Sequence, residues 1–227
     1  MGNNAGSVST SYSNVVTLTS GAGASAISVA ITPRANQQQG IIRHSTGTVA
    51  TNFAGYTYGG IGSSAGSLFI GSGTISIETY VNIETLSTAT ERFNTMFGYA
   101  VGSNWNNTGN AIFFSYDEGG VQFFEGGTAA TPNWKCYTRG GSTVTRTNTS
   151  VTVNAGQWYK LRIDINTAAT SVSFYIDGTL VATHTTNIPA TTTAMAVISL
   201  INKSVGTTTR TMLTDYFMYE EIFTNPR

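Results

Sequence analysis

The acidic residues Glu78 and Glu84 are the first candidates for chemistry, because two carboxyl groups on one face of a strand can cleave a glycosidic bond. Both lie in the segment 74–84, where apolar and polar residues alternate as in a half-buried β-strand. They are six residues apart, which is about 20 Å along a strand at roughly 3.3 Å per residue. Retaining glycosidases need a separation of about 5 to 5.5 Å. We therefore expect solvated or groove-lining side chains here and no catalytic residues.

The two histidines and the single cysteine offer no recognisable nucleophile or general base. His184 falls at the end of a predicted strand, where we expect a surface residue. No nearby histidine would lower the pKa of the Cys136 thiol, so we interpret it as an unreactive strand residue. A single cysteine cannot form an intrachain disulfide, and core packing alone must stabilise the fold.

Aromatic residues beside amide and charged groups are the better candidates for binding, because aromatic planes suit the apolar faces of sugar rings. Two such groups stand out, with Trp105, Asn106 and Asn107 in the first and Trp134, Tyr137 and Arg139 in the second. The alternative for each tryptophan is that it packs over a sheet edge. We take both groups as candidate ligand-binding residues.

The composition excludes several classes of protein. The chain has 227 residues, with 11 Lys plus Arg and 11 Asp plus Glu, so no net charge attracts it to nucleic acid or to an anionic membrane. No stretch approaches the roughly 18 consecutive apolar residues of a membrane span. Charged residues make up 10% of the chain, against about 25% in an average soluble domain. Ser, Thr, Asn and Gly take their place, as in many proteins that work outside cells or in virions.

Period-two alternation recurs along the chain, and no segment has convincing helical periodicity. Apolar and polar residues alternate in 158–165, and after a turn at 167–170 they alternate again in 172–176. Asp177 and Gly178 then supply the positive φ angles of a two-residue hairpin turn. The other predicted strands are 74–84, 92–101, 111–116, 121–124, 179–183, 194–201 and 210–223, with a hairpin across 117–120.

This pattern predicts an all-β fold, a two-sheet antiparallel β-sandwich of jelly-roll type, because each strand needs a partner for its apolar face. We expect residues 36–227 to form the sandwich domain. Residues 1–35 are rich in glycine and serine, and they are expected to form an N-terminal arm or an edge strand centred on 15–18. The first residues lack the features of a secretory signal, so we expect a chain that is kept in a cytoplasm or released by lysis.

Three segments carry a resemblance to a known superfamily: WYKLRIDI (158–165), VSFYIDGTLV (172–181) and LTDYF (213–217). They resemble the back half of concanavalin A-like lectin/glucanase sandwiches, which include LamG-like domains. The resemblance spans residues 70–223 and implies a curved double sheet. Polysaccharide lyases of this type share a catalytic Gln/His/Tyr/Arg set, and neither His44 nor His184 lies in its motif.

Lectins of this superfamily often hold calcium through aspartate, asparagine and carbonyl oxygens. In this sequence such ligands would come from Asp117 and Glu118 together with Asn104, Asn106 and Asn107. The run 117–120 is already explained as a hairpin turn, however, and no Asp-x-Asp-x-Asp spacing occurs. We therefore expect no metal and no other cofactor, with calcium as the alternative.

The segment QGIIRHSTGT (39–48) is similar to a P-G-I-x-x-x-S-T-G-T opening that precedes such sandwiches in structural proteins of tailed bacteriophages. Gln39 stands where that pattern has proline. The resemblance implies a virion protein that is assembled in the cytoplasm of a bacterial host, with residues 1–35 as an anchor.

From these observations we predict a non-enzymatic virion structural protein, such as a capsid decoration, head fibre or tail-fibre component. Its lectin-like domain is expected to bind host-surface glycans. Its other expected partners are virion proteins and further copies of the chain in a homo-oligomer. The alternative is a free carbohydrate-binding module or lectin, and a glycan-cleaving enzyme is the smaller alternative.

Overall fold

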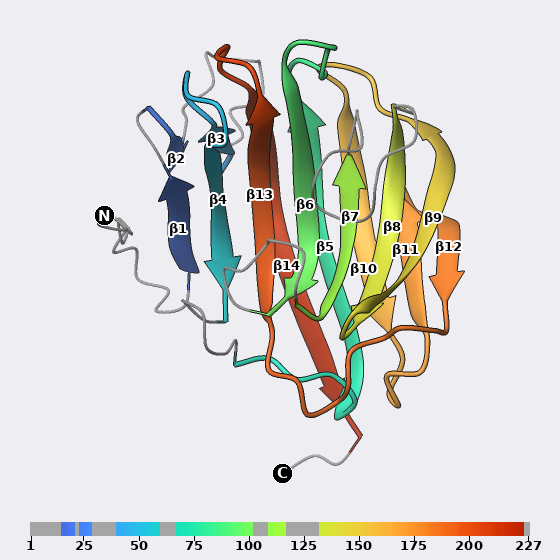
Figure 1. Ribbon diagram of the computed structural model, residues 1–227. Coiled ribbons are helices and arrows are strands. Elements are labelled where there is room, and N and C mark those ends of the chain that lie inside the picture. Colours follow the sequence, from blue (N-terminus) through green and yellow to red (C-terminus); the bar gives the residue numbers. More distant parts are fainter. Residues whose placement is uncertain are drawn as a thin grey trace.

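The computed structural model describes residues 15–20, 23–28, 40–59, 67–101, 109–116 and 132–224. Within these residues the chain forms fourteen β-strands and no helix. The strands make two seven-stranded sheets that lie face to face (Figure 1). Neighbouring strands are antiparallel throughout. The predicted all-β, two-sheet antiparallel sandwich is therefore confirmed.

Sheet I lies in front in Figure 1. Its strands in spatial order are β1 (Val15–Ser20), β4 (Phe53–Tyr58), β13 (Ala196–Val205), β6 (Arg92–Ala100), β7 (Ala111–Tyr116), β8 (Asn133–Gly140) and β9 (Thr143–Thr152). Strands β6 to β9 are neighbours in both sequence and space. In contrast, β13 lies between two strands from the first half of the chain, so the sheet depends on long-range pairing.

Sheet II lies behind it. Its strands in spatial order are β12 (Thr179–His184), β11 (Val172–Ile176), β10 (Trp158–Ile165), β5 (Gly73–Ile83), β14 (Thr211–Phe223), β3 (Ile42–Ser45) and β2 (Ser25–Ser28). Strands β10 to β12 are the successive strands predicted from the sequence. The long strand β5 pairs with β10 on one side and with β14 on the other.

The core lies between the sheets and is built by the predicted alternation. In β5 the inward residues include Ile75 and Ile77, and in β10 they include Leu161 and Ile163, all of them buried in one apolar cluster. Phe97 from β6 belongs to the same cluster. Because each strand places every second side chain on this side, the opposite side of sheet II is left for polar residues.

The predicted hairpin between β11 and β12 is confirmed at its turn. Asp177 has a φ of 51° and Gly178 a φ of 82°, the left-handed geometry that a tight turn between twisted strands requires. The Asp177 carboxylate also accepts a hydrogen bond of 2.8 Å from the backbone N–H of Lys160. The turn of the second predicted hairpin, 117–120, and its second strand, 121–124, lie outside the described residues. The predicted pairing of 111–116 with 121–124 was wrong, because β7 pairs with β6 on one side and with β8 on the other.

A β-bulge interrupts the pairing of β14 with β5 between Asp215 and Phe217. The extra residue is Tyr216, which has a φ of 41°. The Thr79 hydroxyl donates a hydrogen bond of 2.7 Å to the Tyr216 carbonyl and holds the bulge against β5. A bulge of this kind reverses the sides to which the following side chains point.

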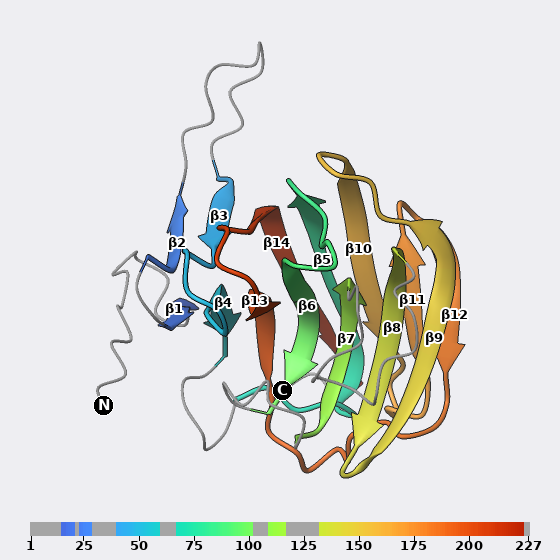
Figure 2. The ribbon, with the colours of Figure 1, turned by 45° about the horizontal axis from the view of Figure 1, so that its top comes forward.

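The two sheets are joined along the side where β9 and β12 lie next to each other (Figure 2). His184 of β12 makes this connection, because its ring nitrogens contact the hydroxyls of Thr138 and Thr147 at 3.0 and 2.9 Å. His184 is only 2% exposed, so the expectation of a surface residue was wrong. Burial lowers its pKa. The C-terminal end of β12 is buried because it packs against β9 of sheet I.

The opposite side of the sandwich contains β1 and β2, which fall within the predicted arm 1–35. β1 is the edge strand of sheet I and pairs with β4, and β2 is the edge strand of sheet II and pairs with β3.

A buried lysine connects two loops near this side. Lys203 of β13 is fully buried, and its ammonium donates hydrogen bonds to the carbonyls of Gly47, at 2.8 Å, and Thr208, at 3.1 Å. Glu91 accepts hydrogen bonds from the backbone N–H groups of Thr207 and Thr208. The loop between β13 and β14 is thus fixed by one cation and one carboxylate.

Candidate functional site

The side of sheet II that points away from the core carries rows of polar side chains that cross the strands. The strand register aligns one such row over β14, β5, β10 and β11: Glu220, Ser76, Asp164 and Ser173. Neighbouring strands are about 4.8 Å apart, so this band of carboxylate and hydroxyl groups is about 15 Å long.

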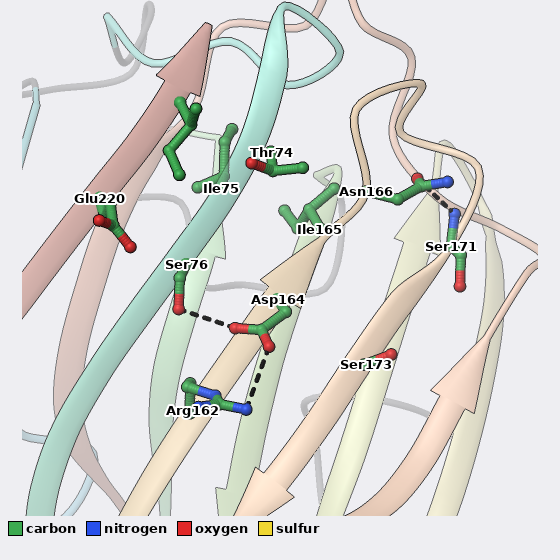
Figure 3. Close-up of a pocket in the computed structure, with 11 residues that line it drawn as sticks. Thr74, Ile75, Ser76, Arg162, Asp164, Ile165, Asn166, Ser171, Ser173 and Glu220 are labelled. Carbon is green, nitrogen blue, oxygen red and sulfur yellow. Dashed lines mark hydrogen bonds and ion pairs between the residues drawn. The ribbon is translucent and has the colours of Figure 1, made fainter.

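The row forms the floor of a groove with a volume of about 410 Å³ (Figure 3). The groove lies where β5 begins and where β10 and β14 end. Its polar lining consists of Thr74, Ser76, Arg162, Asp164, Asn166, Ser171, Ser173 and Glu220. Ile222 adds an apolar wall.

Asp164 and Arg162 are held in place before any ligand arrives. One Asp164 oxygen accepts a hydrogen bond of 2.7 Å from the Ser76 hydroxyl, and the other lies 3.3 Å from a guanidinium nitrogen of Arg162 (Figure 3). The guanidinium carbon of Arg162 lies 4.1 Å from the centroid of the Tyr175 ring. A cation over an aromatic face and beside a carboxylate has little rotational freedom, so the polar floor is preorganised.

The next row along the strands is centred on Glu78, which is 7% exposed. Its carboxylate lies 3.4 Å from the Lys160 ammonium and accepts a hydrogen bond of 2.5 Å from the Tyr216 hydroxyl. Partial burial, together with the hydrogen bond to Glu78 and the charge of Glu78, raises the pKa of Tyr216 to about 12. The Tyr216 hydroxyl therefore keeps its proton at neutral pH and donates it in the hydrogen bond to Glu78.

Two tyrosines form an aromatic pair beside this row. Tyr80 and Tyr216 are 37% and 45% exposed, and their ring centroids are 5.9 Å apart with planes inclined at 45°. Tyr80 reaches the surface through the alternation of β5, and Tyr216 reaches it through the bulge in β14. Together they present exposed aromatic surface a short distance from the polar groove.

Of the site residues predicted from the sequence, Trp105, Asn106 and Asn107 lie outside the described residues. Trp134 is 1% exposed and packs in the core between the sheets, where its ring meets Tyr159 edge-on. The prediction that Trp134 binds a sugar was therefore wrong, because its side chain lies on the inward side of β8. The alternative, that it packs over a sheet edge, was right that Trp134 packs within the fold, but the ring lies in the core between the two sheets.

Tyr137 and Arg139 lie on the outer side of sheet I, on the same strand as Trp134. Tyr137 is 1% exposed and stacks on Phe113 with ring centroids 4.8 Å apart. The Arg139 side chain is also buried and donates a hydrogen bond to the Gly141 carbonyl. Neither residue belongs to the groove, and their role in ligand binding stays a prediction.

The groove residues were visible in the sequence only in part. The alternation of 74–84 and 158–165 already placed Ser76, Tyr80 and Asp164 on the polar sides of their strands. It did not reveal that the two strands are neighbours, which brings Ser76 into hydrogen-bond contact with Asp164. Tyr216 had no signal at all, because an alternating pattern does not show where a bulge occurs.

Three acidic residues of this face have separate ion-pair partners. Glu84 forms an ion pair of 2.9 Å with Arg43, Glu78 pairs with Lys160, and Asp164 pairs with Arg162. No group of three or more His, Cys, Asp or Glu side chains that could hold a metal ion occurs within the described part of the chain. The groove is thus suited to hydrogen bonding with a polar ligand.

Two further observations concern the rest of the described chain. Cys136 is a free, buried thiol in β8, and burial raises its pKa. Its interpretation as an unreactive strand residue agrees with this environment. The ranges that the structure describes include no helix of the length and apolarity needed to cross a membrane.

The fold places the chain in the class of two-sheet antiparallel β-sandwiches. The chain belongs to the family described as SO2946-like, C-terminal domain, which it matches over residues 37–215. No curated protein matches the chain significantly.

Three solved structures show how far this fold extends. The protein of unknown function SO2946 from Shewanella oneidensis MR-1 is 13% identical, with a TM-score of 0.59 over 94% of this chain and 81% of that one. The metal-free carbohydrate recognition domain of Emp46p is 7% identical, with a TM-score of 0.55 over 90% and 88%. Alginate lyase AlyC3 in complex with dimannuronate is 6% identical, with a TM-score of 0.55 over 82% and 76%. At these identities the likeness establishes the fold.

Proposed function

We propose that this protein is a carbohydrate-binding, lectin-like domain whose binding site is the outer side of sheet II. The observation that carries the proposal is the groove of about 410 Å³ with a preorganised polar floor beside the exposed Tyr80–Tyr216 pair. Sugar recognition needs both components. Aromatic rings cover the apolar face of a pyranose, and fixed polar groups orient its hydroxyls.

The polar floor suits hydroxyl groups in particular. Asp164 and Glu220 offer carboxylate acceptors, while Ser76 and Ser173 offer groups that both donate and accept hydrogen bonds. The strand register fixes these side chains in one row. Little side-chain entropy is then lost on binding, which is how a modest groove reaches useful affinity.

We propose further that the domain binds glycans without cleaving them. Glycoside hydrolysis needs one carboxyl group that starts as a protonated general acid and a second that acts on the same bond. Glu78, Glu84 and Asp164 each form a separate ion pair with a lysine or arginine, and no two of these carboxylates share a partner. The arrangement supports binding rather than acid catalysis.

At the level of the organism, we propose that the chain is a structural component of a bacteriophage virion that displays this domain toward host-surface glycans. The similarity of 39–48 to an opening found in tailed-phage structural proteins supports this assignment. The low charged fraction of 10% also supports it. Its partners would be other virion proteins and further copies of itself.

Replacing Tyr80 by alanine tests the binding site. Tyr80→Ala removes half of the aromatic pair from an exposed position, so folding should be retained while glycan affinity falls about tenfold, or about 1.4 kcal/mol. Binding is measured on a glycan array and then by titration with the best ligand. Leu180→Ala, which truncates another exposed side chain of sheet II, is the matched control and should bind normally.

Trp105→Ala is the competing variant, because Trp105 was the first candidate from the sequence. Loss of binding in Trp105→Ala with normal binding in Tyr80→Ala would move the site away from the Tyr80–Tyr216 pair. Absence of binding to every glycan on the array would contradict the proposed function itself.

A further inference from the structure

The charges of the proposed carbohydrate site are unevenly compensated. Arg162 is engaged by Asp164 at 3.3 Å and by the ring of Tyr175. Lys160 is engaged by Glu78 at 3.4 Å. Glu220 lines the groove, is exposed, and has no hydrogen-bond or ion-pair partner among the described residues.

The net charge of the site is therefore negative. Glu78, Asp164 and Glu220 contribute three negative charges and Asp215, which lies opposite Tyr80 in β14, contributes a fourth, whereas Lys160 and Arg162 contribute two positive ones. Within the groove itself the surplus charge belongs to Glu220, which lies in the same cross-strand row as Ser76 and Asp164. Figure 3 shows Glu220 on β14 and Asp164 on β10, on either side of β5.

We infer that this site selects uncharged oligosaccharides and rejects those built of uronic acids. The inference deepens the proposed function and depends on it. A ligand carboxylate placed over the polar row would meet the charge of Glu220 on one side and that of Asp164 on the other. Like charges on neighbouring strands repel. Arg162, the one cation among the described residues that line the groove, is already paired with Asp164. A neutral sugar meets the same two carboxylates as hydrogen-bond acceptors.

The spacing of the site indicates an oligosaccharide rather than a single sugar. Ser76 in the groove and Tyr80 in the aromatic pair are four residues apart on β5, or about 13 Å at roughly 3.3 Å per residue. This is longer than one pyranose ring. A chain of two or more sugars can therefore contact the polar row and the tyrosines at the same time.

The test compares neutral hexose tetrasaccharides of several linkages with the uronate tetrasaccharide of the same linkage, using the full chain. We expect the wild type to bind at least one neutral member about tenfold more tightly than its uronate counterpart. Glu220→Gln keeps the shape and removes the charge. It should strengthen uronate binding about tenfold and change neutral binding less than twofold.

Two controls separate the alternatives. Glu84→Gln removes a carboxylate that pairs with Arg43 outside the groove, and it should leave the preference unchanged. Arg162→Gln removes the cation that could instead capture a uronate. Tighter binding of uronates by the wild type, or an unchanged preference in Glu220→Gln, overturns the inference while leaving carbohydrate binding in place. No binding of any tetrasaccharide overturns the proposed function and the inference together.

Discussion

Tyr216 shows how much of the site depends on a single backbone position. Before the bulge, Met212 and Thr214 point inward and are buried. After it, Phe217 and Tyr219 pack against the core. The alternation of inward and outward side chains in β14 thus shifts by one residue at Tyr216. The Tyr216 side chain points outward, and its hydroxyl donates a hydrogen bond to Glu78. A single alternating pattern applied to 210–223 assigns the residues after the bulge to the wrong side of the sheet. Nothing in the residue types marks the inserted position.

His44 gives a prediction at the same scale. It is fully buried beside Tyr56, and burial lowers its pKa from 6.5 to about 3. The unfolded chain therefore binds this proton at a higher pH than the folded protein does. Stability from His44 is complete above pH 6.5 and is lost as the pH falls from 6.5 toward 3, by about 1.4 kcal/mol per pH unit.

The measurement is urea unfolding at pH 7.5 and pH 5.5, a window above the ordinary pKa values of carboxyl groups. His44→Gln, which cannot titrate, should lose about 1.4 kcal/mol less than the wild type between these two values. The pKa of His184 is also lowered by burial, so His184→Gln should reduce the loss as well. Equal losses in the wild type and in His44→Gln would contradict the assignment.

At the scale of elements, the loop between β13 and β14 depends on a buried cation. Lys203→Met keeps the length of the side chain but removes the donor of the Thr208 carbonyl and leaves the Gly47 carbonyl with only the longer hydrogen bond from the Thr46 hydroxyl. A buried group that loses a partner costs about 1 to 3 kcal/mol, whereas the exposed Thr208 can bind water instead. We therefore expect a destabilisation of about 1 to 2 kcal/mol in denaturant unfolding. Arg146→Met, on the exposed surface of β9, should change stability by less than about 0.5 kcal/mol.

This prediction fails if Lys203→Met unfolds at the same denaturant concentration as Arg146→Met. Glu91→Gln offers a second measurement, because its carboxylate holds the same loop from the other side. It should destabilise the protein in the same direction as Lys203→Met.

The elements also show where pattern reading succeeded. Strands β5, β6, β7, β10 and β11 lie within one or two residues of their predicted bounds. The alternation marks β10 and β11 most clearly, whereas β7 is buried at every position. The Asp177–Gly178 turn was predictable because few residue pairs tolerate two successive positive φ angles. His184 and Trp134 were misplaced because their burial depends on strands that come from elsewhere in the chain.

At the scale of the whole molecule, the virion assignment predicts a symmetric oligomer. Native mass spectrometry of the full chain should give a multiple of the 24.0 kDa protomer. Peptides of the chain should also be found in purified phage particles of the host that encodes it. A monomer whose glycan binding requires calcium would instead favour the alternative of a free lectin, and absence from purified particles would contradict the virion role.

The amino-acid sequence by itself determined that this chain forms two packed antiparallel sheets, because period-two side chains bury one side of each strand and leave the other polar. It also determined which residues of β5 and β10 face outward. The tertiary structure decided which strands are neighbours, and hence that Ser76, Asp164 and Glu220 form one row. It decided the bulge that exposes Tyr216 and the burial of Trp134 and His184. The physical reason is that alternation is local, whereas register and burial depend on long-range contacts between distant parts of the chain.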